Sequence, residues 1–143
     1  ASGRSAALVM LDVDHFKQIN DRHGHAAGDQ ILQTFAATTH GSLREADLFG
    51  RFGGDEFAIL LPETSRSEAL EVVERLRSGV QASPTPVEDG GLVSVTLSIG
   101  VADTEGASIS LELLMRAADK ALYSAKRGGR NQTSFSALEA AET

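Results

Sequence analysis

The sequence contains no cysteine, which excludes a disulfide, a thiolate zinc site and a cysteine nucleophile, and which favours a cytoplasmic location. Long apolar segments are also missing. The longest uninterrupted apolar run, Ala6–Leu11, is far shorter than the roughly 20 residues that a membrane-spanning helix needs. No signal peptide is recognisable, so we expect no membrane segment in this chain.

Basic residues are scarce relative to acidic ones, and the formal net charge is −7. Non-specific binding of nucleic acid is therefore not expected, although a local basic cluster could still bind a nucleotide. With 143 residues and 41% apolar content, the chain can bury one sizeable core. We predict a single domain over residues 1–143, with a tail at 136–143. The start lacks a methionine and is typical of a cut inside a longer protein.

The chain is organised around residues 51–57, RFGGDEF, with apolar residues on both sides. This pattern predicts a β-hairpin whose turn is Gly53–Gly54, because hairpin turns that match strand twist need φ > 0. The turn leads directly into Asp55 and Glu56. Two carboxylates beside a backbone without Cβ atoms suit a metal ion that carries phosphates. For this motif alone, an ordinary hairpin with a solvated acidic turn is the simpler alternative.

Residues 6–13 are predicted to form a buried strand, with a helical segment as the alternative. The strand delivers Asp12 and Asp14 to its C-terminal end, where α/β sheets commonly place their sites. Asp14 is expected to cap the helix at 15–21, whose first amides would form an anion site with Lys17. Taken singly, Asp12 and Lys17 are better explained as solvated surface residues.

Hydrophobic periodicity and turn residues locate the remaining elements. They are a helix with a core face of Ile31, Leu32, Phe35 and Ala36 that ends at Gly41, strands at 48–52 and 58–61, a helix at 65–80, a loop at 83–91, a half-buried strand at 93–101, a helix at 111–126 and a strand at 133–135. His23 and His25 are expected to be loop histidines in water.

The predicted order is β-α-α-β-β-α-β-α-β. With the hairpin at the centre and helices over one face, it indicates an α+β fold with a mostly antiparallel central sheet of ferredoxin-like type.

Four motifs in this sequence resemble those of the GGDEF domain, the catalytic domain of diguanylate cyclases. They are DVDHFKQINDRHGHAAGD at 12–29, GGDEF at 53–57, TLSIGV at 96–101 and ADKALYSAKRGGRN at 118–131. The motifs occur in the family's order and span most of the chain. The family's earlier Asp-x-Leu-Thr-Gly-Leu-x-Asn-Arg segment is absent, so we expect the isolated chain to be only weakly active.

The resemblance implies a palm-like nucleotidyl cyclase fold, GTP as substrate, and two Mg²⁺ ions per half-site with Mn²⁺ as a substitute. It assigns the metals to Asp12, the Val13 carbonyl and Asp55, and catalysis to Asp55 and Glu56. The implied substrate-binding residues are Phe16, Lys17, Asn20, His25, Asp29, Gly53, Gly54, Lys126 and Arg130. Of these, Asn20 and Asp29 would recognise guanine, whereas the basic residues would hold phosphates.

The implied reaction joins two GTP molecules into cyclic di-GMP and two pyrophosphates. One motif set holds one GTP, so a second copy of the domain is needed and a two-fold dimer is expected. Sensor or dimerisation domains are expected in the full-length protein. Two other classes stay open: a catalytically silent module that binds GTP or cyclic di-GMP and regulates a partner domain, and a phosphodiesterase or other nucleotidyl enzyme on the same fold.

Arg44 and Asp47 match the family's product-inhibition motif, Arg-x-x-Asp, which ends five residues short of Gly53. Arg75 on the next helix would be the partner arginine of this inhibitory cyclic di-GMP site. Glu71 stands where many relatives carry another arginine, and it is expected to weaken inhibitor binding. Two alternatives are a plain surface ion pair at Arg44 and Asp47 and product binding in the active half-site instead.

Overall fold

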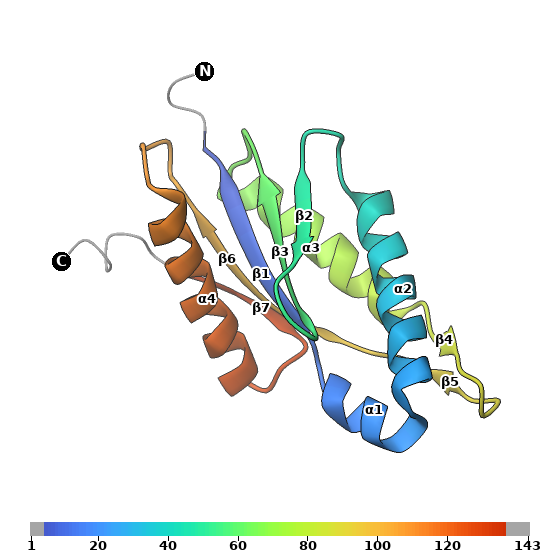
Figure 1. The fold of residues 1–143 in the computed structure, drawn as a ribbon. Helices are drawn as coiled ribbons and strands as arrows, with labels where there is room; N and C mark the ends of the chain where they lie inside the picture. The colour runs from blue at the N-terminus through green and yellow to red at the C-terminus, as the bar shows by residue number, and fades with distance from the viewer. Residues whose placement is uncertain (1–4, 137–143) are drawn as a thin grey trace.

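The structure, a computed structural model, describes residues 5–136. Its elements are β1 (Ala7–Val13), α1 (Phe16–His23), α2 (His25–Ser42), β2 (Leu48–Arg51), β3 (Glu56–Leu61), α3 (Arg66–Gln81), β4 (Thr85–Pro86), β5 (Leu92–Val93), β6 (Leu97–Asp103), α4 (Leu111–Arg127) and β7 (Gln132–Phe135) (Figure 1). This is the predicted order with one addition, the short β4–β5 pair. Apart from Ser136, the predicted tail at 136–143 lies outside the described residues.

Five strands form the central sheet in the order β2-β3-β1-β6-β7. All neighbouring pairs are antiparallel except β6 and β7, which run parallel, so the predicted α+β fold with a mostly antiparallel sheet is confirmed. The hairpin β2–β3 lies at one edge and not at the centre as predicted. The seven residues of β1 are all buried and are paired on both sides, whereas three of the four residues of β2 are exposed.

Helices cover both faces of the sheet, which corrects the prediction of one covered face. Alternate residues of a strand point to opposite faces. Val9 and Leu11 accordingly pack with α2 and α3, whereas Leu8 and Met10 pack with α4. Figure 1 shows α3 and α4 on opposite sides of the sheet. None of the helices in residues 5–136 is long and apolar enough to cross a membrane.

The strand predicted at 93–101 as half-buried is instead split. Val93 belongs to the small β4–β5 sheet, and β6 begins at Leu97 and is buried at all seven positions. The alternation of apolar with small residues was misleading, because the small residues Ser98 and Gly100 have partners inside the protein. Ser98 donates a hydrogen bond to Asp14, and Gly100 lies directly beneath α4.

The contact at Gly100 sets how closely α4 approaches the sheet. A Cβ atom there would lie 2.1 Å from the backbone nitrogen of Leu122 and 2.3 Å from the carbonyl oxygen of Ala118. Both atoms belong to the helix backbone, so neither can move aside as a flexible side chain would. Close packing of α4 on β6 therefore requires glycine at this position.

We predict that Gly100→Ala lowers the free energy of unfolding by about 1–3 kcal/mol, because α4 must shift away from β6. Denaturant unfolding measures the effect. Gly50→Ala is the matched control, because Gly50 also lies in a strand and its added Cβ would meet nothing within 4 Å. Equal unfolding midpoints for Gly100→Ala and the wild type would contradict the packing argument.

Candidate active site

Two carboxylates meet where β1 ends and the β2–β3 hairpin turns. In the sheet register Asp12 stands opposite Glu56 of β3, and the amide of Val13 donates to the carbonyl of Asp55 over 3.2 Å. The side chain of Asp12 contacts that of Asp55 and forms an ion pair with Lys126 from α4. Burial, and after it the close approach of the Asp55 side chain, raise the pKa of Asp12 to about 7. Two acids held this close favour a bound cation.

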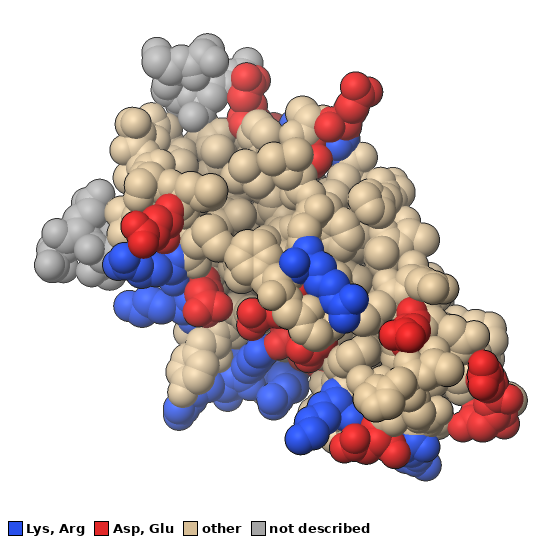
Figure 2. Space-filling view, in the orientation of Figure 1, with Lys and Arg blue, Asp and Glu red and all other residues tan. Residues whose placement is uncertain are grey.

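Most of the residues predicted to bind metal and phosphate line one pocket of ≈ 190 Å³. They are Asp12, Val13, Phe16, Lys17, Asp55, Lys126 and Arg130, joined by Asp14, His15 and Gln18. On the face drawn in Figure 2, Lys and Arg side chains gather at the lower end, where α4 ends and α1 begins, with acidic side chains beside them. The tertiary structure thus brings together residues from both ends of the chain.

The residues of this pocket fit a divalent cation. Asp12 Oδ1 is buried and has no hydrogen-bond partner in the structure. Within residues 5–136 no group of three or more His, Cys, Asp or Glu side chains forms a metal centre. A cation here would therefore rest on two carboxylates and on oxygens of backbone or ligand. Mg²⁺ is commonly held in this way, by one or two carboxylates together with substrate phosphates.

The hairpin turn differs from the predicted two-residue turn. Four residues, 52–55, connect the strands, and neither Gly53 nor Gly54 adopts a positive φ. A Cβ atom on either glycine would meet nothing within 4 Å, so the fold itself does not require glycine there. The open space beside the turn is available to a ligand. Glu56 closes the turn, because its carbonyl accepts from the amide of Phe52 over 2.8 Å.

Arg51 fixes the turn, and sequence reasoning did not single it out for this role. Its guanidinium donates to the carbonyls of Gly53 and Gly54 over 2.9 and 2.6 Å. Its position in the strand, two residues before the first glycine, was the available signal. With both carbonyls held by Arg51, the turn has a defined shape although it contains two glycines.

Asp14 does not cap α1, which corrects the prediction. The residue before the helix is His15, in a left-handed conformation with φ of 60°, and no side chain caps the first turn. Asp14 is instead buried and accepts hydrogen bonds from the hydroxyls of Thr96 and Ser98. The start of α1, with Phe16 and Lys17, still faces the small pocket.

A third hydrogen bond joins Asp14 to the turn after α4, where the amide of Asn131 donates to it over 3.0 Å. Arg130 and Asn131 are both left-handed, with φ of 63° and 47°, which costs about 1–2 kcal/mol per residue outside glycine. A hydrogen bond to a charged group contributes about 1.5–3 kcal/mol. Arg77 adds two more bonds, to the carbonyl and side chain of Asn131. Asp14 and Arg77 thus hold Asn131 from two sides and offset part of the strain of the turn.

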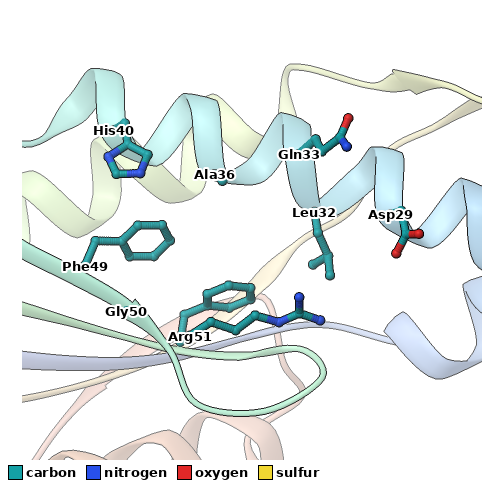
Figure 3. A pocket seen from close by; sticks show the side chains of 9 residues that line it. Asp29, Leu32, Gln33, Ala36, His40, Phe49, Gly50 and Arg51 are labelled. Atoms are coloured by element: carbon teal, nitrogen blue, oxygen red, sulfur yellow. The ribbon is translucent and has the colours of Figure 1, made fainter.

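A second and larger pocket, of ≈ 470 Å³, lies between α2 and the hairpin (Figure 3). Asp29 stands at one end and His40 with Phe49 at the other. Leu32 and Ala36, predicted only as core, line its wall on α2. A pocket with an apolar wall and a carboxylate at its mouth suits a flat, hydrogen-bonding ring such as a nucleobase.

Asn20 and His25 line neither of these two pockets. Asn20 lies on α1 beside Gly28 of α2, where a Cβ atom would come within 1.8 Å of its Oδ1. This Oδ1 is buried and lacks a hydrogen-bond partner in the structure. His25 is the exposed first residue of α2 rather than a loop residue, and His23 ends α1 with its Nδ1 2.8 Å from Asp89.

The sequence profile of the family described as "Diguanylate cyclase, GGDEF domain" matches residues 1–132. This chain belongs to the GGDEF family. It is similar to the response regulator PleD of Caulobacter vibrioides, with 41% identity over 130 residues, which cover 90% of this chain and 29% of PleD. It is 44% identical to the diguanylate cyclase DgcP of Pseudomonas aeruginosa over 130 residues, which cover 91% of this chain and 19% of DgcP.

Solved GGDEF domains share the palm-like fold of this one. The GGDEF domain of YfiN (TpbB) from P. aeruginosa superposes with a TM-score of 0.89 at 39% identity, over 97% of this chain and 81% of that chain. The GGDEF domain of DgcB from Caulobacter crescentus, in complex with c-di-GMP, has a TM-score of 0.87 at 32% identity, over 96% of this chain and 80% of that chain. The chain spans less than a third of PleD and of DgcP.

In this GGDEF domain Arg44 and Asp47 are joined to each other at the end of β2 opposite the turn. Nη2 of Arg44 lies 2.7 Å from Asp47 Oδ1 and also donates to the carbonyl of Pro62 over 2.9 Å. Arg75 on α3 donates over 3.4 Å to the carbonyl of Ser42, two residues before Arg44. The three residues predicted for the inhibitory site therefore lie in one region, separate from the pocket around Asp12.

Proposed function

We propose that this GGDEF domain is a diguanylate cyclase that condenses two GTP into cyclic di-GMP and two pyrophosphates. The observation that carries the proposal is the small pocket in which Asp12 and Asp55 face Lys126 and Arg130. Carboxylates for metal and cations for phosphate stand within one cavity, as phosphoryl transfer requires. The family and the names of its relatives support the same activity.

Asp12, the carbonyl of Val13 and Asp55 would hold two Mg²⁺ ions, with Mn²⁺ as a substitute. The unpartnered Oδ1 of Asp12 supports this assignment, since a buried carboxylate oxygen without a donor is costly unless a cation binds it. When bound, the metal supplies Lewis-acid polarisation of the α-phosphate and neutralises the leaving pyrophosphate. Lys126, which contacts Asp12 in this structure, would turn to the phosphates.

The start of α1 and the two basic side chains opposite it, Lys126 and Arg130, would bind the phosphates. The first amides of a helix point outward and attract anions, and here they belong to the turn that begins at Phe16. Lys17, Lys126 and Arg130 line the same pocket and would donate charge-assisted hydrogen bonds. The open faces of Gly53 and Gly54 would let ribose and phosphate lie against the backbone.

Guanine would bind against α2, at the Asp29 end of the larger pocket. Asp29 would accept from N1–H and the 2-amino group of guanine, and adenine offers no such pair of donors. The unpartnered Oδ1 of Asn20, beside Gly28 of α2, would be a second acceptor, and Leu32 would provide an apolar surface for the ring. His25, at the start of α2, would lie near the nucleoside.

In the reaction, the 3′-oxygen of each GTP forms a bond to the α-phosphorus of the other, and the bond from that phosphorus to pyrophosphate breaks. Asp55 would help to remove the proton of the attacking hydroxyl, and Glu56 would support the turn that carries Asp55. A single chain offers one such site, so a second copy must present the other GTP. The proposed cyclase is therefore active as a two-fold dimer.

We predict that the purified chain converts GTP and Mg²⁺ into cyclic di-GMP, and that folded Asp55→Ala has no activity, because a metal ligand and the group beside the attacking hydroxyl are lost. Mass spectrometry identifies the product. Asp119→Ala, an exposed acid on α4, is the control and should keep wild-type activity. Normal product formation by Asp55→Ala would end the metal-ligand assignment. Binding of GTP or cyclic di-GMP without turnover would instead support the silent-module alternative.

The same assay over a dilution series tests the two-copy mechanism. Rate per mole is expected to rise with protein concentration as dimers form. Sedimentation at each concentration reports the fraction of dimer. A constant rate per mole from a protein that sediments as a monomer would contradict the mechanism.

We predict that Asp29→Ala weakens GTP binding by about 1–3 kcal/mol, because a carboxylate that pairs with a base edge is lost. ATP binding should change little, because adenine lacks the pair of donors that Asp29 would accept from. Calorimetry with both nucleotides and both proteins gives the ratio of GTP affinity to ATP affinity for each protein. If the ratio of GTP to ATP affinity is the same in the variant and the wild type, Asp29 does not recognise guanine.

We further propose that the product, cyclic di-GMP, inhibits this domain at a separate site. Cyclic di-GMP would bind at Arg44, Asp47 and Arg75, where Arg44 meets the O6/N7 edge of guanine and Asp47 accepts from its N1–H and amino group. The ion pair between Arg44 and Asp47 would open to receive the ligand. Glu71, one helical turn before Arg75, would reduce the affinity through its negative charge.

We predict that Arg44→Ala loses cyclic di-GMP binding and product inhibition but keeps GTP binding, because Arg44 lies away from the small pocket. A titration of cyclic di-GMP against Arg44→Ala and Asn20→Ala measures both sites. Thermal unfolding of each variant checks that it is folded. If only Asn20→Ala loses the ligand, product binds in the active half-site and the inhibitory site is excluded.

A further inference from the structure

The proposed mechanism gives no role to the most completely hydrogen-bonded carboxylate near the pocket. Asp14 is only 4% exposed. Its Oδ2 accepts from the hydroxyl of Thr96 over 2.6 Å and from the amide of Asn131 over 3.0 Å, and its Oδ1 accepts from the hydroxyl of Ser98 over 2.6 Å. The donors come from β6, from the residue before β6 and from the turn after α4.

Resting on the proposed function, we propose that Asp14 is a positioning residue that holds the turn at Arg130–Asn131 so that Arg130 faces the phosphate pocket. Arg130 lines the pocket from a left-handed residue, and the next residue is left-handed as well. Such a turn does not persist unless its surroundings hold it. The amide that Asp14 binds belongs to the second of these two residues.

Asp14 acts through Arg130 and not as a ligand of metal or substrate. Three of the roughly four acceptor positions of its carboxylate are already filled by protein donors. Asp12, by contrast, has a buried oxygen without a partner. Of the two carboxylates at this strand end, Asp12 is thus available to bind a cation, whereas Asp14 binds protein donors.

A second clamp on the same turn supports this role. Arg77 on α3 donates to the carbonyl of Asn131 over 3.2 Å and to its side-chain oxygen over 2.9 Å. Asn131 is therefore held from the sheet side by Asp14 and from the helix side by Arg77. Removal of either clamp should displace Arg130, and removal of the buried one should displace it more.

The test measures binding of the α,β-methylene analogue of GTP, which cannot release pyrophosphate, and of guanosine, which has no phosphate. Asp14→Ala should weaken binding of the analogue about tenfold and leave guanosine binding unchanged, because only the phosphate contact is lost. Asp14→Asn should restore most of the affinity, since its amide oxygen can accept at the Oδ2 position and its NH₂ group can donate to Ser98. A residue that bound metal or moved a proton would not be rescued by asparagine.

The decisive measurement is a double-mutant cycle with Arg130→Ala. If Asp14 acts through Arg130, Asp14→Ala should cause no further loss of analogue binding in the Arg130→Ala background. An additive loss, an unchanged affinity in folded Asp14→Ala, or a failure of Asp14→Asn to rescue would each overturn the proposal. A wild type that does not bind the analogue would overturn the proposed function itself, and with it this inference.

Two further variants guard against a purely structural explanation. Asp103→Ala removes another buried carboxylate, 3% exposed and bound to Arg66 at the opposite end of β6. It should lower stability without changing analogue affinity. If Asp14→Ala does not fold, Arg77→Ala replaces it, with an expected loss of about threefold that disappears in the Arg130→Ala background.

Hydrogen exchange at the amide of Asn131 gives a readout that needs no ligand. The amide should be protected in the wild type and exchange at least about tenfold faster in Asp14→Ala. Unchanged protection in that variant would show that Asp14 does not hold the turn, whatever the protein binds.

Discussion

The site depends on one constraint: β1 is paired on both edges and buried along its whole length, yet two acids stand at its end, Asp12 within the strand and Asp14 directly after it. A buried carboxylate is costly unless donors or cations surround it. At the end of β1 the two acids meet this requirement differently. Asp14 is satisfied by protein donors, and Asp12 by Lys126 on one side with one oxygen left open. This imbalance makes the strand end a place for a cation and its ligand.

The neighbours of β1 bring the other components. Pairing with β3 sets the hairpin turn and Asp55 beside Asp12, and pairing with β6 sets Ser98 beside the same strand end. Close packing of α4 on Gly100 then places the last turn of that helix, with Lys126, over the pocket. Each component needs a different tertiary contact, so the site forms only when the sheet and both helical layers are complete.

Much of this could be predicted from the sequence. Hydrophobic periodicity gave the order of the main elements, and the four motifs gave the family and most of the residues that line the small pocket. Errors occurred where a polar or small residue has a partner distant in the sequence. β6 was predicted to be half-buried because Ser98 and Gly100 look like solvent-facing positions. Asp14 was predicted to cap a helix because it stands just before one, and its three actual donors lie 82 or more residues away in the sequence, where local patterns cannot reveal them.

The sequence by itself determined the local choices: which segments are strands or helices, where the glycine-rich turn lies, and which acids and bases are available. These follow from spacing and conformational preference within a few residues. Only the tertiary structure decided that β1 and not the hairpin is central, that helices cover both faces, and that Asp14 faces inward while Asp12 keeps an open oxygen. Those outcomes depend on strand pairing and on the satisfaction of buried polar groups. Both are properties of residues that meet only after folding.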